Sequence, residues 1–221
     1  MPPKPKYTRE QVEQAAFALV CEQGEEALTA RELGRRLGIS VTPLFTLFRD
    51  MEEVRQAVYA RAQRCFEEYM AVAEHYVPAY KKRGLQWVRF AQEQPQLFRL
   101  LYMQRSGAGA DYDRVMQQVG FNKDEDIAII VRDYHATPQQ AEHLFMQLWI
   151  YTYGLCVLCA AQVCSFSEAE IARRLGEIFR GMIHVLAADE AAVAAVQPVA
   201  ADSDTAAQMT RQHPHLQPPS D

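Results

Sequence analysis

The chain has 221 residues, of which 49% are hydrophobic and 23% are charged, so it can bury a core of ordinary size and is not a disordered polymer. Its formal charge is -5, which excludes a protein that coats nucleic acid through general basicity. The charge is unevenly distributed. Up to Arg64 there are ten Lys and Arg against nine Asp and Glu, whereas the remainder has 13 basic and 19 acidic residues. A polyanion would therefore be bound at the N-terminal end.

The first ten residues, MPPKPKYTRE, contain no apolar run after their basic residues and do not resemble a secretory signal. We therefore expect a cytoplasmic protein with a short basic arm that carries Lys4 and Lys6. Thr8 is a helix-capping residue, and the apolar residues after it repeat at helical spacing as far as Gly24. This pattern predicts a first helix that braces the segment after it.

The segment LTARELGRRLGISVTPLFTLFRDMEEV, from Leu28 to Val54, predicts two short helices joined by a tight turn and followed by a longer helix. Two pairs of residues have the spacing of capping boxes: Thr29 with Glu32, and Asp50 with Glu53. Gly38 suits the left-handed position that ends a helix, and Ser40 is then expected to cap the second short helix. This is the arrangement of a DNA-binding helix-turn-helix.

From about Tyr7 to Tyr59 the chain resembles the N-terminal domain of the tetracycline-repressor (TetR/AcrR) family of transcriptional regulators. The family pattern T-x-R-x-L-A-x-x-x-G-V-S, an aromatic recognition helix and an acidic pair are matched by Thr29, Arg31, Leu33, Gly34, Gly38, Ile39, Ser40, Leu44, Phe45, Phe48, Asp50, Glu52 and Glu53. Three positions depart from the pattern. Phe45 replaces a phosphate-binding tyrosine, Leu47 replaces a histidine and Met51 replaces a lysine. The resemblance therefore implies the fold, with fewer polar contacts to the DNA backbone.

A recognition helix presents its first turns to base edges, and the candidates here are Val41, Thr42, Pro43, Thr46 and Leu47. They offer methyl and hydroxyl groups but no Arg, Asn or Gln for a bidentate contact with a base. Backbone contacts are expected from Lys4, Lys6, Thr29, Arg31, Arg36 and Arg49, and Phe45 occupies the family's tyrosine position. For each arginine the alternative is a solvated surface charge. Two alternatives stay open: the head reads methyl-rich bases, or it depends on these basic residues.

The remainder of the chain is also expected to be helical. Proline, glycine and capping residues divide it into helices from Met51 to about His75, Pro78 to Gln94, Pro95 onward, Asp111 to His135, Thr137 to about Cys164 and Ser167 to about Ala187. We therefore predict an all-α fold. An N-terminal three-helix helix-turn-helix DNA-binding domain (1–50) precedes a C-terminal helical ligand-binding and dimerisation domain (51–187) and a disordered tail (188–221).

The run from Leu148 to Cys164 is almost entirely apolar, but it is shorter than the ~20 residues of a membrane span and lacks basic flanks. We therefore expect no membrane association. A helix that is apolar all round must be covered on all sides, and the last helix also has a continuous apolar stripe. The family resemblance implies a homodimer in which the last two helices of each chain form a four-helix bundle.

The resemblance also implies that the helices after Tyr59 enclose a site for a small-molecule effector. This region is rich in aromatic and methionine side chains, which line apolar cavities and also fill ordinary cores. The candidates for ligand binding are Trp87, Phe90, Phe98, Tyr102, Met103, Met116, Phe145, Trp149 and Tyr153. Few charges fall among them, so an apolar or amphipathic effector is expected.

Five cysteines are present, and Cys156 and Cys159 form a C-x-x-C pair with Cys164 further along. Buried, reduced thiols are the favoured interpretation, with a redox or soft-metal sensor as the alternative. We expect no cofactor and no metal.

The function that the sequence favours is a ligand-responsive transcriptional regulator, a repressor, that binds palindromic double-stranded operator DNA as a homodimer. An enzyme is not expected, because G-x-G-x-x-G, P-loop, H-E-x-x-H and G-x-S-x-G motifs are all missing. The alternative is a helical interaction protein that keeps the helix-turn-helix scaffold but has weak or no DNA binding. Phe45, Leu47 and Met51 support this alternative, since each removes a polar contact.

Overall fold

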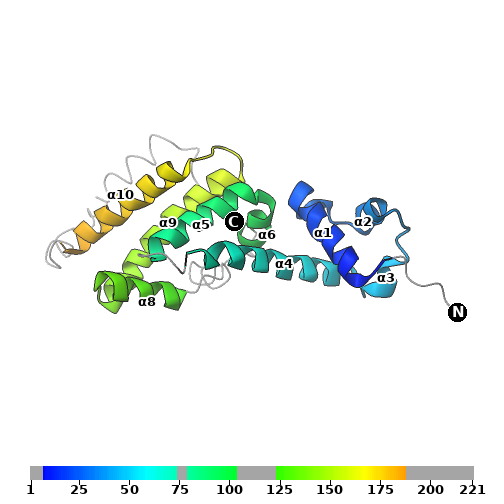
Figure 1. Cartoon of the computed structure of the whole chain (residues 1–221), viewed down its shortest axis with the longest axis horizontal. Helices are drawn as coiled ribbons and strands as arrows, with labels where there is room; N and C mark the ends of the chain where they lie inside the picture. Colours follow the sequence, from blue (N-terminus) through cyan, green and yellow to red (C-terminus); the bar gives the residue numbers. More distant parts are fainter. Residues whose placement is uncertain (1–6, 74–78, 104–122, 188–221) are drawn as a thin grey trace, which may run out of the picture. The chain divides into compact units, whose positions relative to one another are not determined.

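The computed structural model describes residues 7–73, 79–103 and 123–187, and every regular element in these ranges is helical (Figure 1). The elements are α1 (Arg9–Gln23), the 3-10 turn η1 (Glu25–Ala27), α2 (Ala30–Leu37), α3 (Leu44–Leu47), α4 (Met51–Ala71), α5 (Ala79–Glu93), α6 (Pro95–Tyr102), α8 (Lys123–Tyr134), α9 (Pro138–Ala160) and α10 (Glu168–Ala187). The all-α prediction is therefore confirmed for these residues. The tail predicted for 188–221 and the helix start predicted at 111 lie outside the described residues.

Helices begin where the sequence predicts caps. Three complete capping boxes are formed, by Thr8 with Gln11, Thr137 with Gln140, and Ser167 with Glu170. Two predicted boxes are only half formed. Thr29 and Asp50 accept from the backbone N–H groups of Glu32 and Glu53, but the two glutamate side chains bond elsewhere. The helix starts are thus fixed by local chemistry that is visible in the sequence.

The N-terminal helices pack into a head around one apolar core. α1 packs against α2 and α4, and its buried face is the one that the periodicity predicts: Val12, Ala16, Leu19 and Val20. Leu33, Leu44, Phe48, Val54 and Val58 complete this core. α4 continues unbroken from the head to Ala71, so head and body share one helix. The domain boundary at residue 50 stays a prediction.

The turn after α2 depends on two glycines. Gly38 adopts the left-handed conformation, with φ of +64°. The N–H of Ile39 then donates to the Gly34 carbonyl at 3.0 Å, and the Tyr7 hydroxyl donates to the Leu37 carbonyl at 2.6 Å. This turn brings the Ile39 carbonyl so close to α2 that a Cβ on Gly34 would lie 2.9 Å from it. A side chain at position 34 would therefore require the Ile39 carbonyl to shift.

The helix after this turn is shorter than predicted. The sequence suggests a helix capped by Ser40, but α3 covers only Leu44–Leu47 and its N-cap is Pro43, which makes no side-chain cap bond. That prediction was wrong. Pro43 has no N–H to donate and disfavours a helical conformation in Thr42, so the α-helical ladder starts late. Residues 41–43 form tighter turns instead, with the Leu44 N–H donating to the Val41 carbonyl at 3.1 Å.

In the body, α5 and α8 pack against α9, and α6 packs against α5 and α9. α9 contributes many of the buried side chains, among them Leu144, Phe145, Leu148, Trp149 and Leu155. It begins at Pro138 as predicted but ends at Ala160, before the predicted end near Cys164. Gln162, just beyond, adopts a positive φ of +58°.

α9 is long and apolar enough, by length and composition, to cross a membrane. The helix is therefore longer than the run from Leu148 to Cys164, and its length does not exclude a membrane span. Half of its most apolar 18-residue window is nevertheless buried inside the protein, and a core helix has the same composition. This burial supports the prediction of a core helix.

The chain divides into two compact units, residues 1–179 and 180–221, so the last turns of α10 belong to the second unit. Within the first unit, Ile171 and Leu175 are buried, and Leu175 packs closely over Gly84, where an added Cβ would lie 3.1 Å from its Cδ1. The start of α10 is thereby held against α5.

Gly34→Ala is expected to destabilise the protein by about 1–3 kcal/mol, because the new Cβ must displace a backbone carbonyl rather than a flexible side chain. The measurement is urea or thermal denaturation followed by circular dichroism. Gly181→Ala is the control: Gly181 lies in α10 with nothing within 4 Å of its added Cβ, so alanine should stabilise the helix by up to about 1 kcal/mol. Equal effects of the two substitutions would contradict the close approach at position 34.

Candidate nucleic-acid interface

Arg9 links α1 to the end of α3 and the start of α4. Its guanidinium donates to the carboxylates of Glu13 at 2.9 Å and Glu53 at 2.8 Å, and to the Leu47 carbonyl at 3.3 Å. It also lies over the ring of Phe48, 4.5 Å from the centroid. One side chain of α1 thus holds the end of α3 and the start of α4 in fixed positions.

The carboxylates at the start of α4 are stabilised in their charged form. The pKa of Glu53 is lowered because Glu53 accepts from the N–H of Arg49 and pairs with Arg9, and the pKa of Asp50 is lowered because Asp50 accepts from the N–H of Glu53. A lowered folded pKa contributes stability that is present above the unfolded value of about 4 and is lost as the pH falls through the folded value. These contacts are therefore intact at neutral pH.

The predicted base-reading residues lie together on one exposed surface. The exposed residues are Val41, Thr42, Pro43, Phe45 and Thr46, whereas Leu47 is half-buried and Leu44 and Phe48 are buried. The N–H groups of Leu44, Phe45 and Thr46 donate to the carbonyls of Val41, Thr42 and Pro43, so a tight turn leads directly into α3 and these residues follow one another closely. Val41 is 36% and Phe45 44% exposed. The Thr46 hydroxyl donates to the Pro43 carbonyl at 2.7 Å, so its hydrogen is already in use.

Several arginines of the head are engaged in exposed ion pairs. Arg36 makes a bidentate pair with Glu22, at 2.6 and 2.7 Å, and this contact lowers the pKa of Glu22. Arg49 lies 3.4 Å from Asp50. Because exposed pairs are weak, a DNA phosphate can replace the carboxylate, although loss of the ion pair reduces the free energy gained from binding the phosphate. Arg36 is therefore a less favourable phosphate contact than an arginine that has no carboxylate partner.

Two predicted phosphate contacts are better placed. Arg31 is exposed and forms no ion pair with the residues that the structure describes. The Thr29 hydroxyl accepts from the Glu32 N–H at 3.2 Å, which leaves its own hydrogen free for a phosphate oxygen. Lys4 and Lys6 lie outside the described residues.

In the body, five of the predicted ligand-binding residues form one aromatic cluster. The Trp87 ring lies 5.9–6.3 Å, between centroids, from the rings of Phe98, Tyr102, Trp149 and Tyr153. Trp149 and Tyr153 stack with centroids 5.1 Å apart, and the Tyr153 hydroxyl donates to the Tyr102 carbonyl at 2.8 Å. These rings pack on one another, so the core interpretation describes them in this structure. Their role in ligand binding stays a prediction.

The other predicted ligand-binding residues are dispersed. Phe90 packs edge-on against Phe66 and Tyr69, and Phe145 is buried in the core. Met103 is 36% exposed, and Met116 lies outside the described residues. The sequence therefore identified residues of one aromatic core together with residues that do not belong to it.

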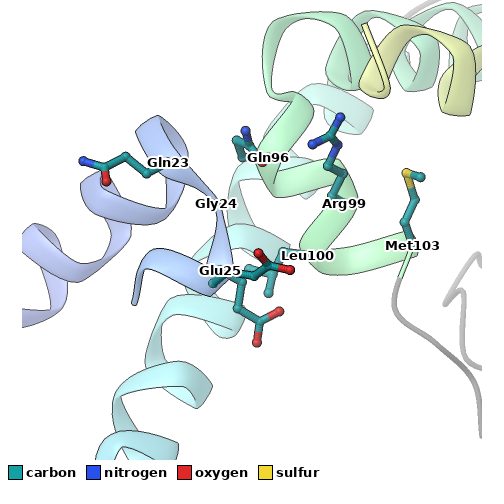
Figure 2. Close-up of a pocket in the computed structure, with 8 residues that line it drawn as sticks. Gln23, Gly24, Glu25, Gln96, Arg99, Leu100 and Met103 are labelled. Atoms are coloured by element: carbon teal, nitrogen blue, oxygen red, sulfur yellow. The ribbon is translucent and has the colours of Figure 1, made fainter. Parts of the chain in front are cut away.

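A cleft of about 330 Å³ lies where the end of α1 and η1 face α6 (Figure 2). It is lined by Gln23, Gly24, Glu25, Glu26, Gln96, Arg99, Leu100 and Met103. Gln96 lies over Gly24, where an added Cβ would be 3.0 Å from Oε1, and Arg99 donates from Nε to the Ala160 carbonyl at 3.0 Å. The cleft thus marks a junction at which α6 contacts both α1 and the end of α9.

The body also contains a buried ion pair that the sequence analysis missed. Arg83 of α5 donates to Asp126 of α8 at 2.6 Å, and it pairs with Glu125 at 2.9 Å. Asp126 is only 3% exposed, and its burial raises its pKa more than the Arg83 charge lowers it. The two residues are far apart in the chain, and no local pattern pairs them.

α9 also presents an exposed apolar stripe. Ile150 is 50% and Leu158 40% exposed, and the exposed Gly154 lies midway between them. These residues are spaced four apart and therefore share one face of the helix. Such a row on a helix whose other faces are buried has the chemistry of an interface.

The thiols of the C-x-x-C pair are buried. Burial raises the pKa of Cys156 well above its usual value and that of Cys159 to about 11, and the Cys159 Sγ lies 3.4 Å from Gln92 Oε1. In the described ranges no group of three or more Cys, His, Asp and Glu side chains is arranged to hold a metal ion. The buried-thiol interpretation is therefore favoured.

Comparison with solved structures identifies several chains of the same fold. A TetR-like transcriptional regulator from Rhodococcus sp. RHA1 aligns with a TM-score of 0.59 and 18% identity, over 85% of this chain and 100% of that one. A member of the TetR family from Streptomyces coelicolor A3 aligns with a TM-score of 0.50 and 14% identity, over 80% of this chain and 98% of that one. A protein from Mesorhizobium loti MAFF303099 that is assigned to the TetR-family transcriptional regulators aligns with a TM-score of 0.51 and 17% identity, over 83% of this chain and 98% of that one.

Neither a scan against models of known protein families nor a search of curated proteins finds a match. The structural likeness shows that the chain has the fold of TetR-family proteins, so the predicted fold is confirmed.

Thiol labelling tests the burial of the C-x-x-C pair. In native protein a water-soluble disulfide reagent is expected to label at most the half-buried Cys21, Cys65 and Cys164, and all five thiols should react after unfolding. Cys164→Ser serves as the control and should remove one native label. Rapid labelling of Cys156 or Cys159 in native protein would favour the sensor alternative.

Proposed function

We propose that this chain is a TetR-family transcriptional regulator, a repressor, that binds palindromic operator DNA as a homodimer and releases it when a small molecule binds in the body. The observation that carries the proposal is the exposed surface around α3, which Arg9 and the two-glycine turn hold in position. A helix-turn-helix whose second helix is exposed and rigidly mounted suits insertion into the major groove. Such a regulator acts in the cytoplasm and is not an enzyme.

Backbone contacts in this proposal come from few residues. Arg31 supplies a cation, Thr29 a hydroxyl, and Arg36 and Arg49 contribute after exchanging a carboxylate for a phosphate. Lys4 and Lys6 extend the contact if the N-terminal arm enters a neighbouring groove. The small number of contacts implies modest binding to DNA of unrelated sequence.

The exposed stripe on α9 supports the proposed homodimer. Ile150, Gly154 and Leu158 give a partner helix an apolar row with one position that lacks a side chain, which allows close approach. Two copies of the head related by twofold symmetry would read two half-sites about one helical turn apart.

Release by an effector requires a mechanical connection from the body to the head. Trp149 and Tyr153 of α9 lie in the aromatic cluster, Tyr153 bonds the end of α6, and α6 packs against α1. A ligand that displaces these rings would therefore move α6 and, through Gln96 against Gly24, the end of α1. The apolar character of the cluster favours an apolar or amphipathic effector.

The alternative is a helical interaction protein without DNA binding. It is favoured by Phe45 and Leu47, which carry no polar group, and by the pairing of Arg36 with Glu22. Selection of duplexes from a random pool separates the two functions. A palindromic consensus supports the regulator, and absence of selective binding at low salt supports the interaction protein.

Arg31→Ala is expected to weaken binding to all duplexes about equally and to flatten the dependence of log K on log salt by about one unit of slope. The measurement is fluorescence anisotropy at several salt concentrations with the selected duplex. Arg89→Ala is the control and should change neither quantity, because Arg89 is an exposed residue of α5, outside the head, and is paired with Glu93. An unchanged slope for Arg31→Ala would remove it from the backbone contacts.

Leu158→Lys is expected to convert the dimer to monomer, because it places a charge in an apolar interface without a partner. Light scattering coupled to size-exclusion chromatography measures the mass. Val72→Lys is the matched control: Val72 is 45% exposed at the end of α4, outside the stripe. A Leu158→Lys variant that stays dimeric would place the interface elsewhere.

A further inference from the structure

We propose that the head recognises the 5-methyl group of pyrimidines in the major groove and leaves the purine partner unread. It would therefore accept 5-methylcytosine paired with guanine where it accepts thymine paired with adenine. This inference rests on the proposed DNA binding and specifies what that surface selects.

The exposed groups of the segment from Ser40 to Leu47 are those that contact methyl groups. Val41 and Phe45 expose apolar surface, and the exposed Thr42 and Thr46 each carry a γ-methyl group. Thymine and 5-methylcytosine both present a methyl group in the major groove, at the same ring position. A surface of this composition gains contact area from either base.

The same segment has little means of reading the purine. Guanine and adenine are distinguished by bidentate contacts from Arg, Lys, Asn or Gln, and residues 40–47 contain none of these. The Thr46 hydroxyl donates its hydrogen to the Pro43 carbonyl, which leaves Ser40 and Thr42 as hydroxyls that bond either purine.

The nearest guanidinium groups do not supply the missing contact. Arg9 is held between Glu13 and Glu53 against the Leu47 carbonyl. Arg36 and Arg49, which pair with Glu22 and Asp50, are assigned to the DNA backbone in the proposed function. Arg31 stands at the second position of α2, the helix that crosses the DNA backbone in a helix-turn-helix. Discrimination between adenine and guanine is therefore weak, while discrimination by the methyl group persists.

The size of the effect follows from burial of one methyl group, about 0.8 kcal/mol, which corresponds to about fourfold in affinity. The experiment starts from a duplex selected from a random pool with the full-length protein. Thymines of the half-site are replaced one at a time by deoxyuridine, which keeps every hydrogen bond and removes only the methyl group. We expect about a fourfold loss at each thymine that faces Val41 or Phe45.

A second series replaces the same base pair by 5-methylcytosine–guanine or by cytosine–guanine. Binding should stay within about twofold of the thymine duplex for the first and fall about fourfold or more for the second. Equal weakness of both cytosine duplexes would show that a group other than the methyl group is read, on the purine or at position 4 of the pyrimidine, and would overturn the proposal. Selective binding with no loss on deoxyuridine substitution would overturn it too, while leaving the proposed regulator intact. Absence of any selective binding would instead remove the regulator itself.

Two exposed valines provide matched variants. Val41→Ser should reduce the preference for thymine over deoxyuridine at its contact position to about one, with an unchanged salt slope, because only methyl groups are removed. Val72→Ser, on α4, should leave the preference unchanged. Thermal melting of both variants checks that the fold is retained. A Val41→Ser variant that keeps the full preference for thymine would contradict the assignment of the methyl contact to Val41.

Discussion

The close approach of the Ile39 carbonyl to Gly34 is the constraint on which the head depends. It lets the chain reverse immediately after α2, with Gly38 in the left-handed conformation and the Ile39 N–H bonded back to the Gly34 carbonyl. The reversal carries Leu44 and Phe48 into the core, and the Phe48 ring then lies under Arg9. Since these two side chains point inward, the remaining positions around α3 point outward. The exposed surface thus follows from a turn in which any larger residue at position 34 would have to displace the Ile39 carbonyl.

Two arginines of the head form ion pairs within the head. Arg9 donates to Glu13, Glu53 and the Leu47 carbonyl, and both terminal nitrogens of Arg36 donate to Glu22. The outward surface around α3 is left neutral and apolar. In the proposed function, phosphate binding would then provide modest affinity, and shape and methyl contacts would provide the choice of site. This division is consistent with a protein whose formal charge is -5.

The sequence predicted what local chemistry determines. Thr8, Thr137 and Ser167 cap helices because their partners lie three residues away, and Gly24 and Gly38 end helices for reasons contained in the residues themselves. The late start of α3 was also local, but the effect of Pro43 was outweighed by the apparent cap at Ser40.

Contacts between distant segments could not be predicted. Three kinds of contact join residues that only the folded chain brings together: the pair of Arg83 with Asp126, the bond from Arg99 to the Ala160 carbonyl, and the contacts of Arg9 with Leu47, Phe48 and Glu53. Of the candidate base-reading residues, Val41, Thr42, Pro43 and Thr46 are exposed and Leu47 is half-buried, and this exposure follows from the burial of Leu44 and Phe48. Their contact with bases stays a prediction. The hydrogen bond from the Thr46 hydroxyl to the Pro43 carbonyl, which occupies one of the hydroxyl donors of this surface, could be found only in the structure.

α9 links the two halves of the proposed function because two of its faces have different neighbours. One face presents Trp149 and Tyr153 to the aromatic cluster and, through Tyr153, bonds α6, while the other carries the exposed stripe of Ile150 and Leu158. In the proposed dimer the stripe is fixed by a partner helix, so α9 is the stationary element. A ligand that enters the aromatic cluster then displaces the less constrained neighbour, α6, which packs against α1. In this proposal the displacement of α6 therefore reaches the head, because the second subunit prevents α9 from moving instead.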